Sequence, residues 1–180
     1  METMLFTERS IWTMVHGIVL GGGALLALGA ALFGLRAMRG MPAGTLAAEE
    51  QARQLGRLLV VGAVLLWATV AVGTYVTFPP YRAPPPEGLG DLSAYPRALL
   101  RASPGTAWLH SFGMEIKEHV PWMTAMLATA VAAVATRYRG HLLEDRRING
   151  MATALVAICL ALVAFTALLG VFVNKVAPLE

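Results

Sequence analysis

Residues 106–136 read TAWLHSFGMEIKEHVPWMTAMLATAVAAVAT, and this stretch decides the fold. Its second half is an uncharged apolar segment that is long enough to cross a bilayer. Its first half holds two of the four histidines of the chain, together with two carboxylates and a lysine. Three further long apolar segments occur in the chain, and we therefore expect an integral membrane protein.

The composition supports this expectation. The chain has 180 residues, of which 57% are hydrophobic and 14% are charged, whereas soluble domains carry about 25% charged residues. The net charge is +3, but most basic residues lie beside the ends of apolar segments, where topology signals occur. We therefore expect no nucleic-acid partner. The single cysteine, Cys159, lies inside an apolar segment and is interpreted as a packed thiol.

The predicted fold class is an all-α integral membrane protein, a single domain over residues 1–180 with an up-down-up-down bundle of four transmembrane helices. The first segment is too long for the apolar region of a signal peptide and follows an acidic amino-terminal region, so we interpret it as a transmembrane helix. The predicted spans are 11–35, 58–78, 107–137 and 151–173.

The connections carry further signals. Thr45 is suited to cap a short interfacial helix that leads into the second span, and Pro79-Pro80 is expected to end that span. Residues 79–105 form a long loop rich in proline and glycine. The third helix measures about 46 Å at 1.5 Å per residue, so we expect it to extend beyond the membrane on the outer side, with a kink at Pro121.

Basic residues predict the orientation. The first and third connections hold more of them than the opposite side, so these connections are expected on the inner side of the membrane. The two groups are Arg36, Arg39, Arg53, Arg57, Arg137, Arg139, Arg146 and Arg147 against Arg9, Arg82, Arg97, Arg101, Lys117 and Lys175. Both termini and loop 79–105 should then lie on the outer side, which is periplasmic for a bacterial inner membrane.

Two histidines are predicted at similar depth. His16 lies about two turns into the first helix, and His119 lies where the third helix enters the membrane. Ionisable residues inside membranes are costly and are candidates for function. A b-type haem takes one axial nitrogen from each side of the macrocycle, so we expect haem iron to bind His16 and His119 between helices one and three. Two histidines that only pack within the bundle are the alternative.

Glycines follow His16 closely. Gly17 and Gly21 form a G-x-x-x-G pair, which lets another helix backbone approach. The same pair would leave space for a flat cofactor, so both glycines are candidate haem contacts. Close packing between helices is the simpler interpretation.

Other polar residues of the third helix are candidates too. Glu115 and Glu118 could accept protons from a quinol, or they could belong to a solvated amphipathic face. His110 could serve a second haem or metal, although a solvated or subunit-facing position fits it better. A non-haem metal held by Glu115, His119 and His16 is disfavoured, because the E-x-x-H spacing of di-iron bundles is absent.

The leading hypothesis is a membrane-embedded b-type cytochrome subunit that passes electrons between a quinone pool and a redox partner at the outer face. Its partners would be the lipid bilayer, quinone, and other subunits of a redox complex or further copies of the chain. The four-helix arrangement resembles membrane b-type cytochromes in architecture only. The alternative is a cofactor-free accessory subunit of a larger membrane complex. The sequence leaves open whether the chain catalyses a reaction.

Overall fold

The computed structural model describes residues 6–177, and every regular element within them is a helix. Four helical segments of this part of the chain are long and apolar enough to cross a membrane. They are Glu8–Met38, Leu46–Arg82, Pro104–Arg137 and Arg146–Val176, called helices 1 to 4 below. The expected all-helical protein with four candidate membrane spans is confirmed.

Helices 1 to 3 are interrupted by a π-helical insert, whereas helix 4 is the regular α9 (Arg146–Val176). Helix 1 consists of α1 (Glu8–Met14), η1 (Val15–Gly21) and α2 (Gly22–Met38). Helix 2 consists of α3 (Leu46–Val72), η2 (Gly73–Thr77) and α4 (Phe78–Arg82). Helix 3 consists of α6 (Pro104–Trp108), η3 (Leu109–Met114) and α7 (Glu115–Arg137). The short helices α5 (Pro96–Arg101) and α8 (Arg139–Glu144) lie in connections.

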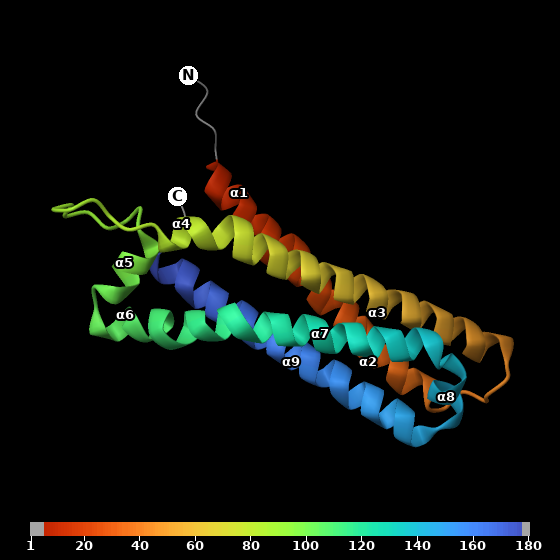
Figure 1. Cartoon of the computed structure of the whole chain (residues 1–180). Helices are drawn as coiled ribbons and strands as arrows, with labels where there is room; N and C mark the ends of the chain where they lie inside the picture. Colours follow the sequence, from red (N-terminus) through yellow and green to blue (C-terminus); the bar gives the residue numbers. More distant parts are fainter. Residues whose placement is uncertain (1–5, 178–180) are drawn as a thin grey trace.

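The bundle has two distinct ends (Figure 1). The start of α1, the end of α9 and residues 83–103 lie at one end, which we call the loop end. The connections 39–45 and 138–145 lie at the other, which we call the arginine end.

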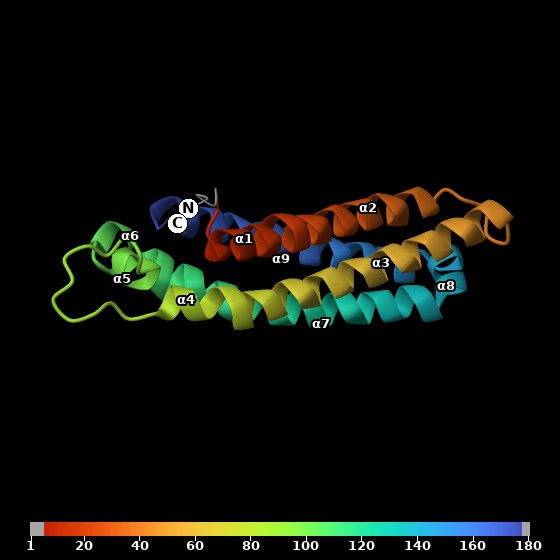
Figure 2. The ribbon, with the colours of Figure 1, turned by 90° about the horizontal axis from the view of Figure 1, so that it is seen from above.

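Each long helix packs against two others. α2 contacts α3 and α9, and α7 contacts the same two helices. Helices 1 and 3 therefore lie diagonally opposite each other across the bundle, as do helices 2 and 4. Figure 2 shows this arrangement from above, with α2 and α9 beside each other and α3 beside α7.

The buried apolar side chains form two separate clusters. The larger one fills the bundle from its middle to the arginine end and includes Leu28, Leu59, Val131 and Val156. The smaller one lies at the loop end. Its members are Tyr81, Leu100, Leu109, Met114 and Ala177. Many buried positions of the larger cluster are alanines, which lets the helix backbones approach closely.

Two helix boundaries differ from the sequence-based expectation. Thr45 does cap a helix, since its hydroxyl accepts a hydrogen bond from the Ala48 amide. That helix is α3 itself, however, and no separate interfacial helix precedes the span. Helix 2 also continues through Pro79-Pro80 to Arg82. It tolerates them because they lie in the first turn of α4, after a π-helical insert, where the missing amide protons cost little.

Helix 3 is long, as expected, but helix 2 is longer still. Helix 2 has 37 residues and helix 3 has 34, against 31 in each of the others. Helix 4 ends at Val176, three residues beyond the predicted end of the fourth span at 173. Residues 1–5 and 178–180 lie outside the described residues.

Candidate functional site

A layer with polar side chains separates the two apolar clusters. The larger cluster reaches no closer to the loop end than Ala24, Val70, Ala125 and Val163. Beyond these positions, each helix contributes one residue to a set that we call the polar layer. These residues are His16 of helix 1, Gly73 of helix 2, Lys117 of helix 3 and Gly170 of helix 4.

His16 lies against helix 2 at Gly73. A Cβ atom on Gly73 would lie 2.8 Å from Cε1 of the His16 ring, closer than real contacts allow. The Nδ1 atom of His16 is buried and has no hydrogen-bond partner among the described residues. Buried polar atoms without a partner are rare and call for an explanation, and a bound ligand is one such explanation.

Lys117 enters the same layer from helix 3. A Cβ atom on Gly170 would lie 2.9 Å from Nζ of Lys117, so the amine lies directly against the backbone of helix 4. The residue is half-buried and forms no ion pair or side-chain hydrogen bond within the described part of the chain. It lies close enough to His16 to act on it electrostatically. Helices 1 and 3 thus each contribute one ionisable side chain to the polar layer, and each of these side chains lies against a glycine of a neighbouring helix.

The π-helical inserts lie at this layer or beside it. η1 contains His16, η2 begins with Gly73, and η3 contains His110 just before the turn that carries Lys117. Such inserts are rare and occur frequently at functional sites, because one extra residue redirects the side chains that follow. Three of them at the same end of one bundle indicate that this end is specialised.

His119 does not face the polar layer. Its side chain is 71% exposed, and its Nδ1 lies 2.8 Å from the backbone oxygen of Glu115, one turn earlier. The Glu115 carboxylate lies 3.8 Å from the same nitrogen and is also largely exposed. Glu115 and His119 therefore lie together on the outside of helix 3. His16 and His119 are not brought together, and their joint ligation of haem iron stays a prediction.

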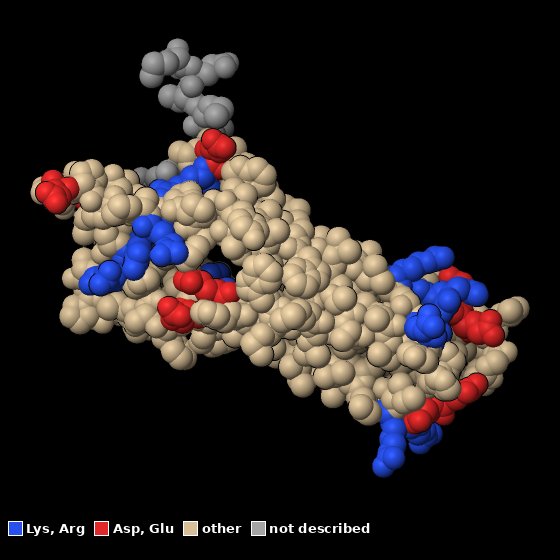
Figure 3. Space-filling model, viewed as in Figure 1, with Lys and Arg blue, Asp and Glu red and all other residues tan. Residues whose placement is uncertain are grey.

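Glu118 lies between the polar layer, which contains Lys117, and the exposed face of helix 3, which carries His119. It is half-buried, and Arg82 and Arg97 of the loop end lie near enough to act on it electrostatically. Figure 3 shows a hollow in this face of the molecule, with acidic side chains at its rim, a basic side chain deeper inside and further basic side chains beside it.

His110 has a specific partner. Its Nδ1 lies 2.9 Å from the hydroxyl oxygen of Tyr81 on helix 2, and the residue is half-buried. Because Tyr81 belongs to the loop-end apolar cluster, this hydrogen bond ties helix 3 to helix 2. The suggested second haem or metal site at His110 and the solvated or subunit-facing alternative both stay predictions.

The two glycines of the predicted pair lie in different surroundings. Gly17 is exposed, and a Cβ atom there would meet nothing within 4 Å. Gly21 is buried, and a Cβ atom there would lie 3.3 Å from the backbone oxygen of His16. Close contact between helices occurs instead at Gly62, where a Cβ atom would lie 3.4 Å from the Cβ of Ala27.

No group of three or more His, Cys, Asp or Glu side chains suited to a metal ion occurs within residues 6–177. Cys159 is fully buried and free, as its interpretation as a packed thiol requires. Met123 and Met126 on helix 3 are both largely exposed on its surface.

Sequence reasoning missed Lys117, Gly73 and Gly170. The spacing of residues in helix 3 did contain a signal for Lys117. Lys117 precedes Thr124 by seven residues and Val131 by fourteen, which is close to two and four helical turns, so the three side chains share one face of the helix. Thr124 and Val131 are both buried. The two glycines carry no such signal, since their role depends on which side chain of a neighbouring helix they face.

The chain matches no known family, no curated protein and no solved structure.

Proposed function

We propose that this protein is a membrane-embedded b-type cytochrome subunit that passes electrons between a quinone pool and a redox partner at the loop end. One observation carries the proposal. The His16 ring packs against the backbone of Gly73, and its buried Nδ1 has no hydrogen-bond partner among residues 6–177. Histidine is a common ligand of haem iron, and a histidine inside the bundle could hold a haem there. Haem would supply one-electron redox chemistry, and the protein would bind and orient it.

The second axial position has two candidates on helix 3. The sequence favours His119, which is exposed on the outer surface of the helix. Lys117 is the alternative, because its amine lies in the same layer as His16. In both cases the proposal keeps His16 as the ligand from the interior of the bundle.

The carboxylates of helix 3 have a role in the same proposal. Glu115 and Glu118 lie on helix 3 within one turn of Lys117, and Glu118 is half-buried. A carboxylate at the membrane interface can accept a proton from a quinol as its electrons leave. The proposal therefore assigns proton handling to these two residues and electron transfer to the cofactor.

An orientation belongs to the proposal as well. The four helices would cross a bacterial inner membrane in an up-down-up-down order, with the loop end on the periplasmic side. The arginine end would then face the cytoplasm, as the excess of basic residues in its connections predicts. The part of helix 3 near Pro104 would project beyond the bilayer, because 34 residues exceed the hydrocarbon thickness.

A cofactor-free accessory subunit is the second candidate, and the orientation of His119 favours it. With its exposed His119 and Glu115, helix 3 presents polar groups outward rather than a second imidazole to the interior. Such a surface, together with the loop of residues 83–95, would contact neighbouring subunits.

A reduced-minus-oxidised visible spectrum of the purified protein, with haem quantified as pyridine haemochrome, tests the proposal. We expect a sharp b-type α band with one haem per chain. His16→Ala should abolish the band, because it removes the interior ligand.

Two variants then identify the second ligand. Loss of the band in His119→Ala, with Lys117→Met unaffected, would support the bis-histidine site. The reverse result would assign the second position to Lys117. A flat spectrum from folded protein supplied with haem during expression would overturn the cytochrome proposal and favour the accessory subunit.

A further inference from the structure

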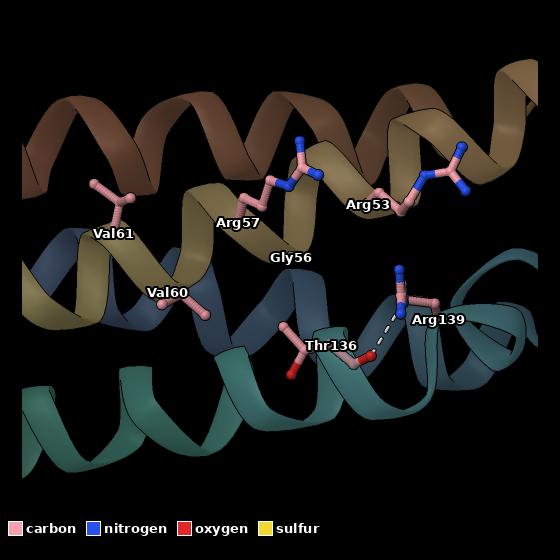
Figure 4. Close-up of a pocket in the computed structure, with 7 residues that line it drawn as sticks. All are labelled: Arg53, Gly56, Arg57, Val60, Val61, Thr136 and Arg139. Carbon is pink, nitrogen blue, oxygen red and sulfur yellow. Dashed lines mark hydrogen bonds between the residues drawn. The ribbon is translucent and has the colours of Figure 1, made fainter.

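A groove opens between helices 2 and 3 at the arginine end, far from the polar layer. Its volume is about 510 Å³. Figure 4 shows Arg139 reaching from the beginning of α8 into the space between α3 and α7. The groove is lined by Arg53, Gly56, Arg57, Val60, Val61, Thr136 and Arg139.

The residues that line the groove include three arginines and no acidic residue. Of these arginines, Arg53 is paired with Glu50, at 2.8 Å. Arg57 and Arg139 form no ion pair within the described residues, and the Nε of Arg139 donates to the backbone oxygen of Thr136. Arg57 and Arg139 both line the groove, and they favour a bound anion, because arginine matches the geometry of a phosphate.

The remainder of the groove is apolar. Val60 and Val61 are 42% and 51% exposed on helix 2. Gly56 brings the two helices together, since a Cβ atom there would lie 3.2 Å from Cγ2 of Thr136. The walls of the groove thus change from charged to apolar within two turns of helix 2, at the position where its uncharged span begins.

From this arrangement we infer that the groove binds one anionic phospholipid. The phosphate lies between Arg57 and Arg139, and the first part of an acyl chain lies along Val60 and Val61. Only an amphipathic anion satisfies both halves of the groove, and basic pockets between transmembrane helices are suited to acidic lipid headgroups. The inference is independent of any cofactor in the polar layer.

Native mass spectrometry of the full chain in detergent, titrated with palmitoyl-oleoyl phosphatidylglycerol, tests the inference. We expect one tightly retained lipid per chain and at least about tenfold weaker binding of phosphatidylcholine. The double variant Arg57→Gln/Arg139→Gln should weaken phosphatidylglycerol binding about tenfold or more, because each basic side chain at a membrane surface contributes appreciably to binding of an acidic lipid.

The matched control is Arg36→Gln/Arg147→Gln, which removes the same charge from exposed positions outside the groove. Equal weakening in both double variants would show attraction to the general charge of this end and would overturn the site. Equal binding of both lipids to the unaltered protein would also overturn it.

A second variant tests the apolar half without changing charge. Val60→Trp should block the acyl-chain path and weaken phosphatidylglycerol binding, whereas Leu26→Trp, on the exposed surface of helix 1, should not. Unchanged binding in Val60→Trp would overturn the inference. Soluble glycerol 3-phosphate should compete poorly, and competition at equal concentration would assign the groove to a free phosphate compound instead of a lipid.

Discussion

The side chains of His16 and Lys117 each lie against a glycine of the neighbouring helix. A Cβ atom on Gly73 would clash with the His16 ring, whereas one on Gly170 would meet the flexible end of the Lys117 side chain. The Gly73 backbone accommodates the imidazole, and the Gly170 backbone accommodates the amine. Both side chains carry polar atoms that are expensive to bury in a membrane protein. Their close approach to a helix backbone therefore indicates two specific contacts between helices. Each contact can be tested by replacing the glycine with alanine, which adds a single methyl group.

Gly73→Ala should destabilise the protein by about 1–3 kcal/mol, because the added Cβ overlaps the His16 ring and forces it or helix 2 to move. The free energy of unfolding in detergent measures this effect. In a His16→Ala background the same substitution should cost much less, since the ring is gone, giving a coupling energy of about 1 kcal/mol or more.

The control for this prediction is Gly17→Ala. Gly17 is exposed, with nothing within 4 Å of an added Cβ. Because alanine is the better helix former, this change should be neutral or slightly stabilising. A Gly73→Ala effect that is the same with and without His16 would contradict the assigned contact.

At the scale of elements, the helices differ between their two ends. Toward the arginine end they are regular and pack through alanine and glycine, as at the contact between Gly62 and Ala27. Toward the loop end three of them contain π-helical inserts. Regular close packing stabilises the bundle, while the inserts orient individual side chains at the polar layer.

Gly62→Leu should strongly destabilise the pairing of helices 1 and 2, because its Cβ alone would already lie 3.4 Å from the Cβ of Ala27. We expect a loss of about 1–3 kcal/mol or more, or failure to yield folded protein. Thermal unfolding in detergent and the yield of monodisperse protein measure it.

Gly29→Leu is the matched comparison, since it adds the same side chain to a helix position with nothing within 4 Å. It should retain the stability of the unaltered protein. If both leucine variants behaved alike, the close contact at Gly62 would not be important for packing.

At the scale of the whole molecule, the bundle has two chemically different ends. The loop end carries the polar layer, Glu115 and Glu118, and the hydrogen bonds that the Arg9 side chain donates to backbone oxygens of Pro80 and Ala94. The arginine end carries the lipid groove and a buried network in which the Arg39 Nε donates to the Asn149 side chain. This polarity is what a protein with a fixed orientation in a membrane requires.

Labelling with a membrane-impermeant maleimide measures that orientation. Ser93→Cys lies in the loop of residues 83–95, and Gly40→Cys lies in the connection at the arginine end; both positions are exposed. We expect Ser93→Cys to react from the periplasmic side and Gly40→Cys to react only after the membrane is permeabilised. The native Cys159 is fully buried and should contribute little background. Labelling of Gly40→Cys alone from the outside would reverse the proposed orientation.

The sequence by itself determined the fold class and the four candidate spans. This information is contained in long apolar segments, where hydrophobicity averaged over about 20 residues is insensitive to local irregularity. The sequence also located the Thr45 cap and directed attention to His16. These features depend on residues close together in the chain, so local chemistry suffices to predict them.

Only the tertiary structure decided which side chains face the interior. Each π-helical insert adds one residue, which rotates the following helix by about 100°. A prediction that assumed regular helices therefore could not assign a direction to His110 relative to His119. The roles of Gly73 and Gly170 likewise depend on contacts between helices distant in the chain. The rotational phase of helix 3 is likewise a property of the packed bundle, and it turns Lys117 toward Gly170 of helix 4 and leaves His119 exposed.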